Sequence, residues 1–195
     1  MPTDELESAE ESLAVLEQVL HGIGKDDEAK QTPCREFDVA KLTDHLMNSI
    51  TAIGGHAGAE FPERDRNDSV ERQVILAARP ALDAWHKRGL DGMVSSGQGG
   101  EAPASIMAGI LSIEFLVHAW DYAKATGGEV TASDALSDYV MGLAKTIITP
   151  QGRSSVGFDD PVDVAADAGA GQACRLHRPA AELAACDSPI SAPGS

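Results

Sequence analysis

The sequence predicts an all-α protein, a four-helix bundle with one accessory helix and an irregular C-terminal tail. Apolar residues recur at three- and four-residue intervals in five segments, and each segment begins at a capping residue or ends at glycine. No convincing period-two alternation occurs before the short Val-Asp-Val at 162–164. We therefore expect helices, and not a sheet, to form the core.

The first two helices are marked by their apolar faces and their ends. Gly22 and Gly24 lie where the first helix should stop, and Asp38 is a good N-cap for the second. The apolar face of the first helix is Leu6, Leu13, Leu16, Val19, Leu20 and Ile23. The apolar face of the second is Val39, Leu42, Leu46, Ile50, Ile53 and Ala57, with glycines 54, 55 and 58 fraying its end.

Three further helices follow. Ser69 caps a third helix, inside which Pro80 predicts a kink or a break. Residues 89–103 are rich in Gly and Ser and predict a loop. The fourth helix spans about 103–126 and stops at a Gly-Gly pair, and Thr131-Ala-Ser-Asp134 resembles a capping box that opens a fifth helix reaching about residue 148.

Composition and charge exclude several classes of protein. The chain has 195 residues, of which 43% are hydrophobic, which is enough for one domain with a sizeable core. A net charge of −16 argues against binding to nucleic acid or to anionic membranes, because both need a basic surface. Three scattered cysteines, no signal peptide and no apolar run near 18 residues predict a soluble protein of the reducing cytoplasm.

The fourth helix carries polar residues on its apolar face. Glu114, His118 and Asp121 fall within the stripe formed by Ile106, Ile110, Ile113 and Val117. An unpaired buried charge is expensive, so this pattern requires an explanation. Glu114 and His118 are one helical turn apart and can reach a single metal ion, and Asp121 is a candidate partner that orients His118. The spacing fits equally a buried carboxylate–histidine pair without metal, or a helix turned so that Glu114 reaches solvent.

A third metal ligand must come from another helix. His45 and His56 both flank the apolar face of the second helix, but they are eleven residues apart, roughly 16 Å along the axis at ~1.5 Å per residue. They cannot share an ion, and His45 lies in the better-ordered first turns. Two histidines and one carboxylate leave open coordination positions, as catalytic metal sites do. Asn48, Ser49 and Arg79 could line a pocket, and the sequence does not rank them.

Two segments together resemble a known family. They are Thr-Pro-Cys-Arg-Glu-Phe-Asp-Val-Ala-Lys-Leu-Thr-Asp-His-Leu (32–46) and Glu-Phe-Leu-Val-His-Ala-Trp-Asp-Tyr-Ala-Lys-Ala-Thr-Gly (114–127). Over about residues 5–167 the chain resembles the DinB-like helical bundle family, in the branch with the metal-binding domain of mycothiol-dependent maleylpyruvate isomerase. The resemblance implies a divalent metal, usually zinc, held by His45, Glu114 and His118. It also implies a thiol cosubstrate such as mycothiol or bacillithiol.

Two functions follow as hypotheses. The first is a metal-dependent transferase or isomerase that uses a low-molecular-weight thiol against an electrophilic small substrate. The second is a non-catalytic metal-binding or regulatory module. The ligand set is compatible with zinc, nickel, iron or manganese.

The C-terminal part departs from the resembling family. We expect a metal-binding domain at 1–167 and a disordered tail at 168–195, because the tail is rich in Ala, Gly and Pro and lacks periodicity. The family's isomerase has a second domain, for which this tail leaves no room. Residues 174–181 read Cys-Arg-Leu-His-Arg-Pro-Ala-Ala, and one codon choice read one base later encodes the family-like Ala-Ala-Tyr-Thr-Gly-Arg-Gln-Pro. We therefore hypothesise a frameshift near residue 170.

Overall fold

A computed structural model describes residues 1–96 and 100–148 and shows a mainly helical protein. Its five α-helices are α1 (Glu5–Leu20), α2 (Val39–His56), α3 (Val70–Arg88), α4 (Ala104–Thr126) and α5 (Asp134–Ile147). A short 3-10 helix, η1 (Lys25–Asp27), precedes α2. The all-α prediction is therefore confirmed for the described residues. The tail at 168–195, the 162–164 segment and the hypothetical frameshift lie outside them.

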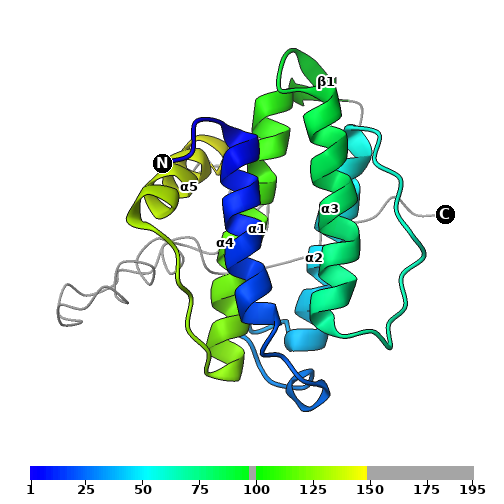
Figure 1. Cartoon of the computed structure of the whole chain (residues 1–195), viewed down its shortest axis with the longest axis vertical. Coiled ribbons are helices and arrows are strands. Elements are labelled where there is room, and N and C mark those ends of the chain that lie inside the picture. The colour runs from blue at the N-terminus through cyan, green and yellow to red at the C-terminus, as the bar shows by residue number, and fades with distance from the viewer. Residues whose placement is uncertain (97–99, 149–195) are drawn as a thin grey trace.

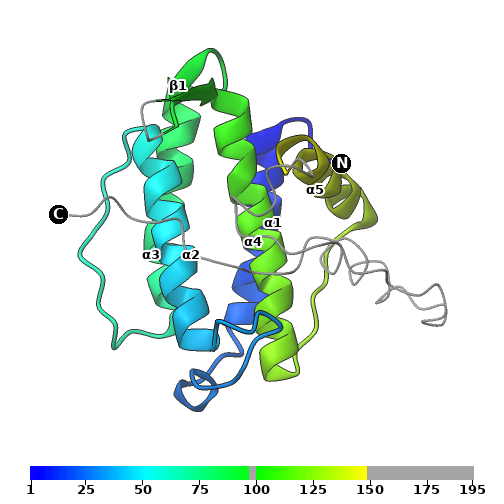
Figure 2. The ribbon, with the colours of Figure 1, turned by 180° about the vertical axis from the view of Figure 1, so that it is seen from behind.

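The four long helices lie side by side, with α1 and α3 in front of α4 and α2 in Figure 1 and behind them in Figure 2. Helices α2 and α3 run in the same direction, because the segment at 57–69 returns along the outside of the molecule (Figure 1). Helix α4 runs opposite to α2, and α5 packs beside α1 and α4. This arrangement places the middle of α4 next to the first turns of α2.

Local sequence signals set the helix ends. The carboxylate of Asp4 accepts hydrogen bonds from the N–H groups of Leu6 and Glu7, and Asp38 and Ser69 cap α2 and α3 in the same way. Helix α4 ends at Gly127, whose φ of 78° is a left-handed conformation that favours glycine. The ends at Asp38, Ser69 and Gly127 agree with the sequence prediction, which named no cap for the start of α1.

Three details differ from the sequence prediction. The loop at 89–103 contains two antiparallel strands, β1 (Met93–Ser95) and β2 (Glu101–Pro103), too short for a periodic signal. The N-cap of α5 is Ser133 and not Thr131, because the Ser133 hydroxyl accepts the N–H of Leu136. Helix α3 is continuous through Pro80. Pro80 is only partly buried, and the carbonyl that it leaves without a helical donor belongs to the exposed residue Leu76.

The core lies between the four long helices. Its largest fully buried side chains are Trp85, Tyr122 and Phe115. The Trp85 indole N–H donates to the carbonyl of Ile53 at 3.2 Å, which ties α3 to α2. Helix α4 is long and apolar enough to cross a membrane, but 72% of its apolar window is buried inside the protein, as in the core helix of a soluble protein.

Tyr122 ties α4 to α2. Its hydroxyl lies 2.9 Å from the Thr43 hydroxyl, which itself donates to the carbonyl of Val39 at 2.8 Å. The Tyr122 O–H is therefore the donor to Thr43, because the Thr43 hydroxyl proton already forms the hydrogen bond to Val39. This buried chain of hydrogen bonds fixes how far α2 and α4 slide past each other, two residues before His45 along α2.

Substitution of Gly54 tests the close approach of α2 to α3. A Cβ at this position would lie 2.7 Å from the Cβ of Ala81 and 2.8 Å from the Phe61 ring, whereas a Cβ at Gly55 would meet nothing within 4 Å. We expect Gly54→Ala to lower the free energy of unfolding by about 1–3 kcal/mol through overpacking. Gly55→Ala should raise it by roughly 0.5–1 kcal/mol, because alanine is the better helix residue. Urea denaturation of both variants measures the difference, and equal stabilities would contradict the close approach.

Candidate metal centre

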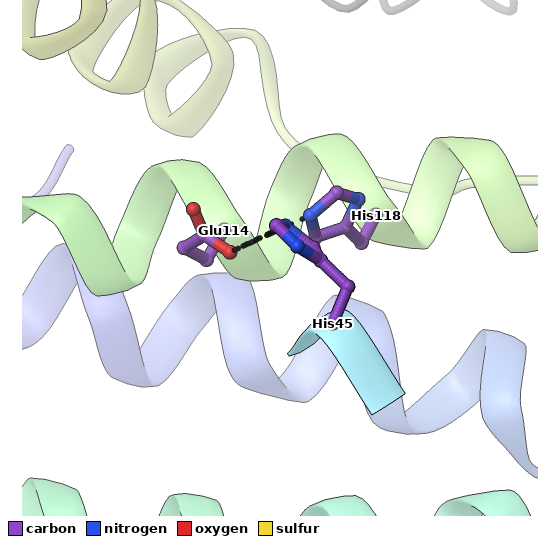
Figure 3. Close-up of side chains that lie close together, drawn as sticks. All are labelled: His45, Glu114 and His118. Carbon is purple, nitrogen blue, oxygen red and sulfur yellow. Dashed lines mark ion pairs between the residues drawn. The ribbon is translucent and has the colours of Figure 1, made fainter. Parts of the chain in front are cut away.

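Three side chains from two helices converge in the interior between α2 and α4 (Figure 3). His45 comes from α2, and Glu114 and His118 come from α4. One ligand atom of each lies within 4.8 Å of the other two. Glu114 Oε2 is 3.4 Å from His118 Nε2 and 3.8 Å from His45 Nε2. The structure thus brings together the three residues that the sequence proposed as ligands.

Helix α4 supplies a pair whose spacing is set by the helix itself. Glu114 and His118 are four residues apart, so their side chains lie one above the other on the same face. That face is directed inward, since the His118 side chain is only 6% exposed and that of Glu114 only 17%. The alternative in which Glu114 turns out to solvent is therefore excluded.

Helix α2 supplies the third side chain. His45 lies two turns after the Asp38 cap, and its ring stands edge-on to that of His118 with 5.2 Å between the centroids. His56 is at the far end of α2 and is not part of the cluster, as the sequence predicted. A metal-free pair within α4 would not require His45, so its approach favours a three-ligand site over a two-residue pair.

Asp121 orients His118. Its Oδ2 lies 2.9 Å from Nδ1 of His118, and both side chains are almost fully buried. Because the carboxylate of Asp121 accepts a hydrogen bond from the Nδ1–H group, Nε2 is the nitrogen that faces Glu114 and His45. Metal-binding histidines almost always have such a partner on the second nitrogen. The contact expected from the sequence is present.

Burial and charge act in opposite directions on these groups. Burial lowers the pKa of His118, but the hydrogen bond to Asp121 and the charge of Glu114 outweigh it and raise that pKa to about 10. Burial and the neighbouring His118 lower the pKa of His45. Burial raises the pKa of Glu114, yet the two histidines and Ser49 bring it below its ordinary value. A metal ion at Nε2 of His118 must therefore displace a proton.

One oxygen shows that the residues fit a cation. Glu114 Oε2 is buried and accepts no hydrogen bond within the described part of the chain. Nε2 of His118 at 3.4 Å and Nε2 of His45 at 3.8 Å lie within ion-pair distance of it but without hydrogen-bond geometry. A buried carboxylate oxygen that accepts no hydrogen bond is costly. Tetrahedral ligands about 2.1 Å from an ion lie about 3.4 Å apart, which matches the Glu114–His118 separation. The His45–Glu114 separation needs only a few tenths of an ångström of closure to match this estimate.

Sequence reasoning did not identify one neighbour of the site, Phe37, and did not rank three others. The Phe37 ring lies against the His45 ring. Ser49 is close enough to Glu114 to lower its pKa. Asn48 instead lines a separate cavity of about 120 Å³ beside Phe61 and Arg64, and Arg79 forms an ion pair with Glu17 on the surface. A helical wheel places Ser49 one turn after His45, which could have ranked it above the other two.

Comparison with known proteins adds two similar sequences. Two uncharacterized proteins of Mycobacterium tuberculosis, from strains CDC 1551 / Oshkosh and H37Rv, are each 26% identical to this chain over 145 residues. The match covers 74% of this chain and 78% of each relative. No protein-family model matches the chain, and no solved structure matches it.

Metal content should depend on all three candidate ligands. We expect His45→Ala, Glu114→Ala and His118→Ala each to lose most bound metal, because two protein donors remain in each variant. His56→Ala, on the same helix as His45, is the control and should keep its metal. Elemental analysis of untagged protein measures the stoichiometry. Full occupancy in His118→Ala would refute the assignment.

Asp121→Asn tests the orientation of His118. The amide preserves the shape of the carboxylate but removes its charge, so we expect metal affinity to fall by roughly 10–100-fold. Competition with a chromophoric chelator measures this change. Unchanged affinity would show that the contact of Asp121 with His118 serves only the fold of α4.

Proposed function

We propose that this protein binds one divalent metal ion through His45, Glu114 and His118, and that the ion is zinc. One observation carries the proposal: two imidazole nitrogens converge on a buried carboxylate oxygen that lacks a hydrogen bond among the described residues. A site of this composition suits a borderline metal that accepts nitrogen and oxygen ligands.

The same proposal includes the architecture. We infer a DinB-like four-helix bundle formed by α1 to α4, with α5 as the accessory helix. The mutual packing of the four long helices supports it, as does the position of α5 beside α1 and α4. The second support is the family resemblance itself, which rests on the paired motifs at 32–46 and 114–127 that carry the three candidate ligands.

The ligand count indicates the chemistry. Three protein donors leave a tetrahedral ion with one position for another molecule. A bound ion would stabilise the ionised form of a sulfur ligand near neutral pH. We infer that this molecule is a low-molecular-weight thiol, and the family resemblance favours mycothiol. The protein would then be a cytoplasmic transferase or isomerase that joins the thiol to an electrophilic small substrate.

The side chains around the site have distinct tasks in this proposal. Asp121 holds the Nδ1 proton of His118, which keeps the Nε2 lone pair directed at the ion. Glu114 contributes the one negative charge of the ligand set. The surrounding α2–α4 interior limits access of water, since the His118 and Asp121 side chains are 6% and 3% exposed.

Thiol binding should require the metal. We expect mycothiol to bind the metal-loaded protein and not the metal-free form, because without the ion the sulfur has no metal to coordinate. Isothermal titration calorimetry of both forms is the measurement, with metal-treated Glu114→Ala as the matched control. Equal binding to the two forms would remove the thiol proposal. Binding without thiol consumption in the presence of electrophiles would favour the non-catalytic module.

A further inference from the structure

The two histidines of the metal centre are held in different ways. His118 has a carboxylate on its second nitrogen, at 2.9 Å. For His45, no described residue forms a hydrogen bond with Nδ1, and the ring is bounded by other rings instead. The Phe37 ring lies 5.2 Å away, centroid to centroid, with 32° between the planes. The edge of His118 lies at the same distance on a near-perpendicular plane.

Phe37 is itself fixed by its backbone. Its carbonyl accepts hydrogen bonds from the N–H and hydroxyl of Thr32, at 3.1 and 2.7 Å, and from the side-chain amide of Gln31 at 2.8 Å. Its N–H donates to the carbonyl of Cys34 at 3.2 Å. The segment at 31–38 closes on itself through a bridge between Gln31 and Asp38, the cap of α2. The phenyl ring is therefore attached to a rigid base beside the start of α2.

From these contacts we propose that Phe37 is a positioning residue that holds the His45 imidazole toward Glu114 and His118. The inference rests on the proposed metal site and adds a residue to it. The His45 side chain is 24% exposed, so without a neighbouring ring it has room for rotamers that direct Nε2 to solvent. The tilted Phe37 ring packed against His45 would exclude those rotamers before a metal ion binds, so less side-chain entropy is lost on binding.

A purely structural role for Phe37 makes a different prediction. Phe37 directly precedes the N-cap of α2, where an apolar residue often packs on the fourth residue of the helix, here Leu42. In that role any bulky apolar side chain suffices, and its loss lowers stability without a specific effect on the metal. The two roles therefore separate when the aromatic ring is removed and the apolar bulk is kept.

The experiment compares Phe37→Leu and Phe37→Met with Phe61→Leu. Phe61 is also partly buried, but it packs on the other side of α2, against Gly54. We expect both Phe37 variants to bind zinc about tenfold more weakly, the lower end of the cost of disturbing a neighbour of a metal-bound histidine. Their cobalt-substituted forms should show an altered visible spectrum, and Phe37→Tyr should restore the affinity and the spectrum. Phe61→Leu should lower the melting temperature and keep wild-type affinity.

Two outcomes would overturn the inference, and they are distinguishable. If Phe37→Leu and Phe37→Met lose melting temperature but keep wild-type zinc affinity and cobalt spectrum, Phe37 serves only the start of α2 and the metal site stands. If the wild-type protein binds neither zinc nor cobalt, the metal centre itself fails, and the inference fails with it.

Discussion

The burial of charge on an apolar helix is the constraint on which the rest of this structure depends. Helix α4 is the central and most apolar helix, yet it directs Glu114, His118 and Asp121 into the interior. Each of these groups would cost several kcal/mol if it were buried alone. They are tolerated because they interact in series: Asp121 accepts a hydrogen bond from Nδ1 of His118, and Glu114 forms an ion pair with Nε2. The series ends at Glu114 Oε2, which both histidines approach without donating a hydrogen bond to it, and this feature supports the proposal of a bound cation.

The position of α2 decides whether the third candidate ligand, His45, reaches Glu114 Oε2. Helix α2 must be placed at one particular position along the axis of α4. The Tyr122–Thr43 hydrogen bond fixes this position close to His45. Towards its C-terminal end α2 approaches α3 so closely that residue 54 has no room for a Cβ. Helix α2 is thus held against two neighbouring helices, and the position of His45 is determined by packing that involves no metal ligand.

Much of this arrangement could be predicted from the sequence because it depends on local spacing. The caps at Asp38 and Ser69 and the end of α4 at Gly127 follow from local capping residues. Helical periodicity placed Glu114 and His118 within the apolar stripe of α4, but it left open a helix turned so that Glu114 reaches solvent. Phe37 could not be found in this way, because its contact with His45 depends on how a non-helical segment closes. Strands β1 and β2 could not be predicted because three residues are too few to show a period. The continuity of α3 through Pro80 depends on the exposure of the Leu76 carbonyl, which the sequence does not show.

The ligands from α4 and the ligand from α2 are positioned by different kinds of structure, and this difference has a consequence for the stability of the fold. Glu114 and His118 are held at their separation by one turn of α4, whatever the other helices do. The distance from His45 to Glu114 depends instead on tertiary packing between segments 69 residues apart in the chain (114 − 45). An ion bound by all three would therefore act as a cross-link between α2 and α4, and its binding free energy would add to the stability of that interface. The partners that already order the histidines, Asp121 and Phe37, lower the ordering cost of that cross-link, because less conformational freedom remains to be lost when the ion binds.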